Sequence, residues 1–340
     1  MTAIADEDVI RCPVVLRNPF AIERLAPLSV VHRAAFRQRR RLSKRFVGKP
    51  AKRLFKLMLR LGVGGDSVFT LATGNGARRV AFNARNTQFG ALYLPQNLPV
   101  YEAETSALLD LLATDAGVFH DIGANWGWYA VLVASRPGFA GSVHAFEPFP
   151  PNFQDLAAVV KQAGLDGAIH CHDVALADRS GETTMAPSDG VQTGLARLGE
   201  DGGVRVRLAR LDDLGLPAPD VVKIDAEDHE LAVLQGAMAT IRSGRPFIVF
   251  ENWLHRGNPP LTLDPFDLLK AEGYRFFYPG WATGEAITTA HQPPGKAVPV
   301  LAAVPFLPSQ RFQLPDQLNV VAVPVERMDD FRRRLGGAGR

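Results

Sequence analysis

From Tyr101 to about residue 253 the sequence alternates between helix-like and strand-like segments, and this alternation restricts the fold more than any other feature. Apolar runs predict strands at 117–121, 141–146, 168–173, 221–225 and 247–251. Helical periodicity between them predicts helices at 102–114, 127–135, 151–163 and 229–242. Such alternation is typical of βαβ units. We therefore expect an α/β fold with a mostly parallel sheet covered by helices.

The segments around this alternation divide the 340 residues further. Prolines recur in the first 30 residues and argue against long helices, so we expect an irregular N-terminal segment, or lead-in, there. The domains that we predict are a basic, partly helical extension at 1–65, a β-hairpin and linker at 66–100, the α/β domain at 101–325 and a charged tail at 326–340. Inside the α/β domain we expect an insertion at about 178–210 and a Pro-rich loop at about 279–316.

Positive charge is concentrated in one segment, although the net charge of the chain is only +3. Arg33 to Arg60 holds 12 of the 38 Lys and Arg residues and no acid. Residues 51–61 have apolar side chains at helical spacing, which predicts a short basic amphipathic helix. This helix could dock its apolar side on the core, or residues 31–61 could contact an anionic membrane. Nucleic acid is not expected, since few aromatic residues interleave the charges.

Cysteine content and hydropathy exclude several classes of protein. Cys12 and Cys171 alone cannot build a disulfide framework or a zinc site, and we expect no metal. Charges interrupt every apolar run before the 18 or so residues that a membrane span needs. No secretory signal is visible, so the expected location is cytoplasmic.

The strongest local signal is an apolar strand that runs through a glycine-bearing turn into a helix, at residues 119–127. Gly123 and Gly127 would let the backbone approach a ligand, and Asp121 stands where open α/β sheets bind ligands. Asn125 occupies the second glycine position of a dinucleotide-binding loop, and no nucleoside-triphosphate loop is present. An acid before the turn suits a cationic ligand end better than a pyrophosphate.

Acids also end the next two strands. Glu147 lies at the tip of the second strand, where it can accept hydrogen bonds from ribose hydroxyls of NAD or of another adenosine ligand. Asp173 closes the third strand and could accept from an adenine amino group. The pattern thus predicts an adenosine-containing ligand.

Six motifs follow one another in order: Asp121–Gly127 (DIGANWG), Ala145–Pro148 (AFEP), Asp173–Asp178 (DVALAD), Leu211–Leu214 (LDDL), Val222–Asp225 (VKID) with Glu227 and Glu230, and Phe250–Glu251. With them, residues 100 to 255 resemble the FkbM-type family of S-adenosylmethionine-dependent methyltransferases, within the class I Rossmann-like enzymes. The resemblance implies a seven-stranded sheet with one antiparallel strand near the C-terminus. It also implies that S-adenosylmethionine is bound by Asp121, Gly123, Ala124, Asn125, Gly127, Glu147, Pro148, Asp173, Val174 and Asp225.

One position departs from the family pattern, because Asp228 stands where members commonly have glycine. If that glycine adopts a left-handed backbone angle, Asp can still adopt it at some cost. The change adds charge beside the expected acceptor. We therefore expect Asp225, Glu227 and His229 to position the acceptor or remove its proton. Alternatively, Asp225 and Glu227 are acids favoured at a helix N-terminus, and His229 is an exposed helix residue.

Glu251, Asn252 and Trp253 follow a strand end that faces the same crevice, where they could contact the acceptor or form a structural cap. The predicted activity is methylation of an oxygen on a sugar, glycan or small hydroxylated metabolite. A nicotinamide-dependent oxidoreductase is one alternative, favoured by Glu147. A non-catalytic, membrane-associated scaffold that binds the cofactor is another.

Overall fold

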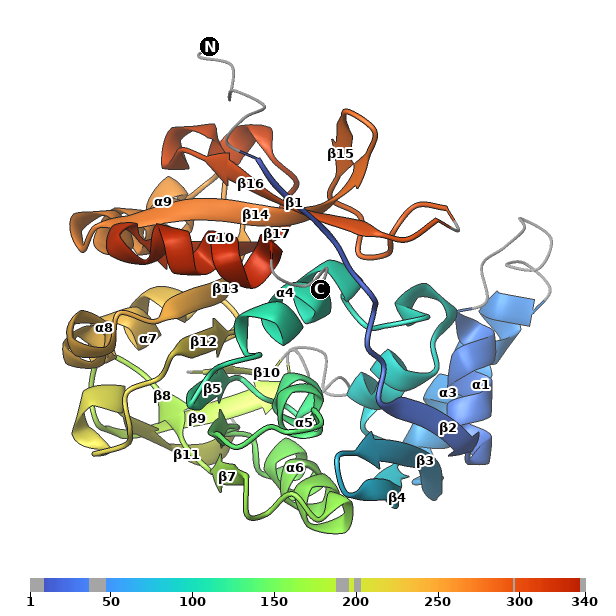
Figure 1. Ribbon diagram of the computed structural model, residues 1–340. Coiled ribbons are helices and arrows are strands. Elements are labelled where there is room, and N and C mark those ends of the chain that lie inside the picture. The colour runs from blue at the N-terminus through green and yellow to red at the C-terminus, as the bar shows by residue number, and fades with distance from the viewer. Residues whose placement is uncertain (1–8, 37–46, 188–195, 199–202, 296, 337–340) are drawn as a thin grey trace.

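One ten-stranded sheet runs through the centre of the computed structural model, which describes residues 9–36, 47–187, 196–198, 203–295 and 297–336 (Figure 1). Its strand order is β1-β16-β14-β17-β13-β12-β5-β6-β7, and β15 pairs with β14. Its strands are β1 (Ile10–Pro13), β5 (Val118–Ile122), β6 (Ser142–Phe146), β7 (Ile169–His172), β12 (Val221–Ile224), β13 (Phe247–Trp253), β14 (Tyr274–Thr283), β15 (Ala286–Thr288), β16 (Val300–Phe306) and β17 (Gln317–Pro324).

The middle of this sheet has the parallel arrangement that the alternation predicts. Strands β7, β6, β5, β12 and β13 are parallel neighbours, and β17 lies antiparallel between β13 and β14. Five of these seven strands, β5, β6, β7, β12 and β13, are the ones predicted from the apolar runs, and the fold is Rossmann-like. The expected total of seven is nevertheless wrong, since β16, β1 and β15 extend the sheet.

The extension of the sheet overturns two local expectations. The segment 279–316, expected to be a loop, holds the end of β14 together with β15 and β16, and the irregular lead-in holds β1. Proline made the sequence of β16 look like a loop. Pro305, however, lies beyond the four residues that pair with β1, where a missing N–H removes no bond to that strand.

Helices cover both faces of the sheet and produce two separate cores (Figure 1). Along β13, Phe247 and Val249 face one core, and Ile248 and Phe250 face the other. The first core includes residues of α4 (Ala103–Leu112), α5 (Trp128–Ala134), α6 (Pro150–Ala163) and α10 (Met328–Gly336). The second includes residues of α7 (Glu230–Gly236), α8 (Met238–Gly244) and α9 (Pro259–Ala271).

The predicted helix 229–242 is broken into α7 and α8. The break follows Gly236, where a Cβ atom would lie 1.9 Å from the carbonyl oxygen of Ala177. Close packing of two backbones therefore interrupts the helix.

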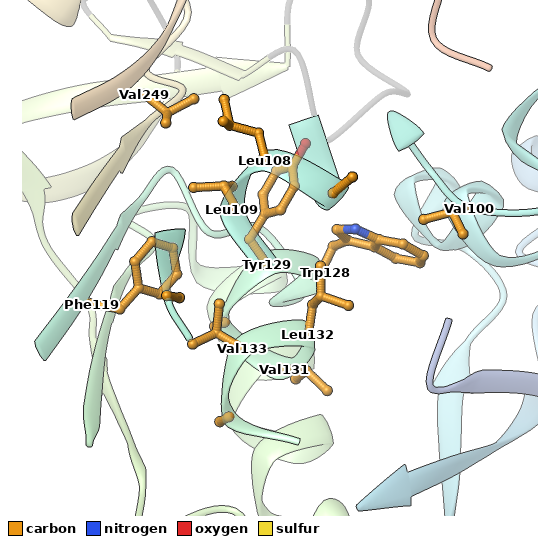
Figure 2. Close-up of a cluster of buried hydrophobic side chains, with 14 of the residues drawn as sticks. Val100, Leu108, Leu109, Phe119, Trp128, Tyr129, Val131, Leu132, Val133 and Val249 are labelled. Atoms are coloured by element: carbon orange, nitrogen blue, oxygen red, sulfur yellow. The ribbon is translucent and has the colours of Figure 1, made fainter. Parts of the chain in front are cut away.

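Figure 2 shows how the first core supports the region where β5 ends. Leu108 and Leu109 of α4 and Tyr129 and Val133 of α5 point toward the side of the sheet where Phe119 lies. All five side chains are buried. The helix after the glycine-bearing turn is thus fixed by packing along its whole length.

The N-terminal extension forms a smaller unit beside the main sheet (Figure 1). It holds an antiparallel sheet of β2 (Phe20–Arg24), β3 (Asp66–Thr73) and β4 (Gly76–Asn83), with α1 (Pro27–Ala35) and α3 (Lys49–Arg60). The hairpin of β3 and β4 is the one predicted, and α3 is the predicted basic helix. Phe55 and Leu59 of α3 are buried against α1, so its apolar side docks on the protein. Residues 37–46 of the basic segment lie outside the described residues.

The insertion after β7 contributes a four-stranded sheet of order β10-β9-β11-β8. Its strands are β8 (Ala175–Leu176), β9 (Gly181–Pro187), β10 (Ala196–Leu198) and β11 (Val204–Ala209). Residues 188–195 and 199–202 of the predicted insertion lie outside the described residues. None of the helices in the described part of the chain combines the length and the hydropathy of a membrane span.

Candidate active site

A cavity of about 270 Å³ opens where β5, β6 and β12 end. It is bordered by residues from the predicted strand ends, from α5 and from the loop before α7. The predicted site residues that line it are Asp121, Gly123, Ala124, Asn125, Glu147, Pro148, Val174, Asp225, Glu227, His229, Glu251 and Trp253. Gly127, Asp173 and Asn252 do not belong to its lining.

The turn after β5 is held by backbone contacts with two neighbouring strand ends. The N–H groups of Gly123 and Ala124 donate to the carbonyl oxygen of Phe146 at 3.0 and 2.9 Å. Gly123 has φ +79°, and a Cβ atom there would lie 1.8 Å from the carbonyl oxygen of Asp225. Asn125 adopts φ 51°, and its side chain accepts from the N–H of Trp126. Glycine at 123 is therefore required by the loop after β12.

Gly127 has a packing role that differs from the predicted one. It has φ +96°, and a Cβ atom there would lie 2.7 Å from Cδ1 of Leu156 in α6. The predicted cofactor contact of Gly127 thus has no counterpart in the cavity lining, because the close approach is to a neighbouring helix.

Asp121 and Glu147 are buried carboxyl groups whose oxygens accept backbone hydrogen bonds. Asp121 accepts from the N–H of Ala130 at 2.9 Å, and Glu147 accepts from the N–H groups of Asn125 and Phe149, both at 2.9 Å. Burial raises the pKa of each carboxyl group to about 7. Both can therefore change their charge near neutral pH.

Asp173 is directed away from the cavity. Its side chain is 71% exposed and lies 3.5 Å from Nη2 of Arg207 in β11. The carboxylate of Asp173, which was expected to contact adenine, therefore does not line the cavity. Instead, Val174 and Leu176 supply apolar lining at this end of the cavity. Asp173 follows the last residue of β7, and the position of a residue just after a strand does not determine where its side chain points.

The loop between β12 and α7 has two consecutive residues in the left-handed region. Glu227 has φ 49° and Asp228 has φ 74°, so the expected left-handed angle at the family's glycine position is present. Oδ1 of Asp228 lies 2.8 Å from Nε2 of His255. Glu230 accepts from the N–H of Ala226 at 3.0 Å. The substituted aspartate thus keeps the loop and ties it to the segment after β13.

A buried cation lies beneath the cavity, and the sequence analysis missed it. Lys223 is fully buried in β12, and its Nζ lies 3.6 Å from Oδ2 of Asp225. Burial opposes its charged form, but Asp225, Glu102 and two further carboxylates outweigh this effect and raise its pKa. Glu102 accepts from the hydroxyl of Tyr129 at 2.7 Å. The sequence feature that could have indicated this buried cation is a single lysine in the otherwise apolar strand Val221–Ile224.

Glu251 belongs to the same group of charges. Its Oε2 accepts from Nε1 of Trp253 at 2.9 Å, and its Oε1 accepts from the side chain of Gln317. Burial and, next, the charge of Asp225 raise the pKa of Glu251 to about 9. Burial and the neighbouring charge thus favour the neutral form of this carboxyl group.

Asn252 has a structural role in place of the predicted acceptor contact. It is buried, and its side-chain oxygen accepts from Nε of Arg311 at 2.6 Å while its carbonyl oxygen accepts from Nη2 at 2.7 Å. Its amide donates to the carbonyl oxygen of Thr262. Of the three residues predicted to contact the acceptor, Asn252 is therefore the structural cap.

Histidines on neighbouring strands contact one another. Nδ1 of His144 lies 3.1 Å from Nε2 of His172, and the ring of His120 lies against that of His144. Burial lowers the pKa of His120 to about 3. Within the described ranges, no group of three or more His, Cys, Asp or Glu residues is arranged to hold a metal ion.

The fold and the cavity define a Rossmann-like α/β domain with a ligand cavity at the ends of its parallel strands, and comparison with known proteins gives the family that it resembles. The family model described as the methyltransferase FkbM domain matches residues 121–276. Those residues are therefore similar to a methyltransferase FkbM domain.

Individual proteins that match this chain share 30% or less of their residues with it over the matched part. Hexuronic acid methyltransferase AglP of Haloferax volcanii is 30% identical over 173 residues, which is 50% of this chain and 66% of AglP. Methyltransferase FkbM from Methylobacillus flagellatus is 22% identical and matches 55% of this chain and 43% of its own, with a TM-score of 0.36. O-methyltransferase TomG from Streptomyces achromogenes is 13% identical over 66% of this chain and 88% of its own, with a TM-score of 0.37. The chain thus spans just under two thirds of AglP and less than half of the Methylobacillus protein.

Proposed function

We propose that this chain is an S-adenosylmethionine-dependent O-methyltransferase that acts on a hydroxyl group of a sugar, a glycan or another small hydroxylated metabolite. The observation that carries the proposal is that twelve of the predicted site residues line one cavity, at the strand ends of the part that matches the FkbM domain. The name of AglP, a hexuronic acid methyltransferase, supports a sugar acceptor.

The lining of the cavity fits S-adenosylmethionine. Glu147, with its carboxyl group at the cavity, would accept from the ribose hydroxyls, and Val174 with Leu176 would contact the adenine. Asp121 and Asn125 would surround the methionine end. When bound, the cofactor supplies an activated methyl group on a sulfonium cation. The surrounding carboxyl groups suit that positive charge.

Asp225, Glu227 and His229 line the cavity from the loop before α7 and would hold the acceptor hydroxyl. Transfer to oxygen needs an aligned acceptor and removal of its proton. We assign the proton to the imidazole of His229, because histidine is the side chain that most often serves as a base near neutral pH. Trp253, 40% exposed, would form part of the acceptor wall.

The two alternatives to a methyltransferase are supported to different degrees. The nicotinamide-dependent oxidoreductase has no support, because the matched family is one of methyltransferases. A non-catalytic scaffold would bind the cofactor without turnover. The proposal also places the enzyme in the cytoplasm; contact of residues 31–61 with an anionic membrane is an alternative role of the basic segment and is tested below.

Calorimetric titration of S-adenosylmethionine, S-adenosylhomocysteine and NAD into the purified chain tests the cofactor. We expect micromolar binding of the two adenosyl-sulfur ligands, at least tenfold weaker in Glu147→Ala because a charge-assisted hydrogen bond is lost. Binding of NAD alone, or of none of the three ligands, would overturn the proposal.

Turnover tests the catalytic assignment. Asp225→Ala, Glu227→Ala and His229→Ala should each lower methyl transfer to a hydroxylated acceptor while S-adenosylmethionine still binds. Unchanged turnover in all three variants would remove these roles. Cofactor binding without methyl transfer to any of a panel of uronic acids, neutral sugars and glycans would favour the scaffold.

A further inference from the structure

A second cavity, of about 900 Å³, adjoins the first one. It lies between α3, the segment from Asn83 to Asn97, and the start of α6. Four residues line both cavities, namely Gln88, Ala91, Tyr101 and Asn152. The second cavity is therefore a groove that leads to the proposed methyl-transfer site, and we call it the α3 groove.

The α3 groove carries an excess of positive charge. Lys52, Lys56 and Arg60 follow one another at intervals of four residues, so they lie along one side of α3, and Arg85 completes the set. Asp155 is the one acid among the described residues of the lining. No described acid forms an ion pair with any of the three side chains on α3.

Much of the remaining lining consists of amide and hydroxyl side chains, which both donate and accept hydrogen bonds. They are Asn83, Asn86, Thr87, Gln88, Asn97 and Asn152. Sugar hydroxyls also donate and accept, so this composition suits a carbohydrate.

The groove is held in shape by contacts between its two walls. Nη1 of Arg85 donates to the carbonyl oxygens of Leu59 and Val63 at 3.3 and 3.2 Å, which fixes the end of α3. Nδ2 of Asn86 donates to Asp155 at 2.9 Å, which joins the segment before α4 to α6. His32 packs its ring on Phe55 of α3, with centroids 4.5 Å apart. The charged side of α3 thus belongs to a built wall.

We propose that the α3 groove binds the methyl acceptor and that this acceptor is a carbohydrate with several negative charges, such as carboxylates on a glycan chain. The inference rests on the proposed function, since it concerns the substrate of the same site. Lys52, Lys56 and Arg60 bind the anionic groups, the amides bind hydroxyls, and the end of the chain enters the first cavity past Tyr101. The α3 groove, at about 900 Å³, lies near the upper end of the range of about 300–1,000 Å³ that is typical of ligand pockets.

A membrane surface is the competing partner for α3. Leu54, Leu57 and Leu61 are 47%, 51% and 70% exposed and lie on a different side of the helix from the groove. Lys49 and Arg53 are basic residues of the same helix that do not line the groove, so a lipid surface attracted by the charge of the whole helix would depend on them as well. Two pairs of charge reversals on one helix therefore distinguish the two partners.

The test uses the full chain and two double variants of α3. Lys52→Glu with Lys56→Glu reverses charges in the groove, and Lys49→Glu with Arg53→Glu reverses the same number outside it. The probe is a short hyaluronan oligosaccharide, which has carboxylates on alternate sugars, and an uncharged chitin oligosaccharide of equal length is the control ligand. Binding is measured by calorimetry at low salt without cofactor, and thermal unfolding verifies that each variant is folded.

We expect the wild-type chain to bind hyaluronan oligosaccharide and not the chitin one. The groove variant should bind it at least tenfold more weakly, since two charge-assisted contacts are lost, whereas the outer variant should change by less than about twofold. Equal weakening in both variants, or no binding by the wild type, would overturn the inference. Binding to phosphatidylglycerol vesicles that depends on Lys49 and Arg53, without hyaluronan binding, would assign α3 to a membrane instead.

S-adenosylmethionine titration of the same three proteins separates this inference from the proposed function. Cofactor binding without hyaluronan binding overturns the groove and leaves the methyltransferase intact. Hyaluronan binding that depends on the groove, without cofactor binding, overturns the methyltransferase and leaves the groove as a glycan site.

Discussion

The carbonyl oxygen of Asp225 occupies the space that a side chain on Gly123 would need, at 1.8 Å from the position of its Cβ atom. The turn after β5 and the loop after β12 therefore meet through bare backbone. This contact joins the part of the cavity that would hold the cofactor to the part that would hold the acceptor.

Gly123→Ala should destabilise the protein by roughly 3 kcal/mol or more, because it adds an overpacked contact to a left-handed backbone angle. Gly138→Ala is the matched control, since Gly138 has φ +77° and no atom within 4 Å of its Cβ position. Urea unfolding of both variants measures the difference. Equal losses would mean that the contact with Asp225 carries no cost.

Glu147→Gln should change how stability depends on pH. The folded-state pKa of Glu147, about 7, exceeds its usual value of 4.5, so ionisation costs stability as the pH rises from 4.5 through 7. Relative to the wild type, the variant should gain on the order of 3 kcal/mol between pH 4 and pH 8. Unfolding at a series of pH values measures this gain, and a difference that does not vary with pH would contradict it.

Asp228→Ala should be less stable than Asp228→Gly by about 1–2 kcal/mol. Both variants lose the contact with His255, but only alanine retains the cost of a left-handed residue at φ 74°. Thermal unfolding compares the two directly. If the variants are equally stable, the loop relaxes to another backbone angle when the aspartate is removed.

Asn252→Ala should lower stability by about 2–4 kcal/mol, because it removes a partner of the buried guanidinium of Arg311. The neighbouring Trp253→Ala should cost far less stability, since that side chain is 40% exposed, and should raise KM for the acceptor. Urea unfolding and turnover are measured on both variants. The reverse pattern would return Asn252 to the acceptor site.

Lys223→Met should destabilise the protein by about 3–5 kcal/mol, since it leaves buried carboxylates without their cation. The loss should be larger at pH 9 than at pH 6, because the raised pKa of Glu251, about 9, keeps that group neutral at the lower pH. Lys161→Met, on the exposed side of α6, serves as the control and should change stability little at either pH. A loss independent of pH would show that Lys223 acts by packing alone.

The central strands β5, β6, β12 and β13 could be predicted from the sequence because most of their residues are buried and apolar. The predicted strand 221–225 and the observed Val221–Ile224 differ by one residue. Strand β16 escaped prediction because it contains Pro305, which pairs with β14 but lies beyond the residues that pair with β1.

The site was predictable only where it depends on strand ends. Asp121 and Glu147 follow their strands into the cavity, as expected. Asp173 does not, because the chain after β7 turns its side chain toward Arg207. The pairing of Glu102 with the hydroxyl of Tyr129, and the approach of both to Lys223, depends on tertiary packing between distant segments and has no local signature.

The edge of the main sheet is closed by β1, whose Ile10 pairs with Ala303 of β16. Because a chain is synthesised from its N-terminus, β1 has no partner in this sheet until β16 has been synthesised. Contacts between such distant residues also form slowly during folding. A chain that stops before β16 also lacks β17, so β14 loses both of these neighbours, β1 has no partner, and β13 is left as the open edge of the main sheet.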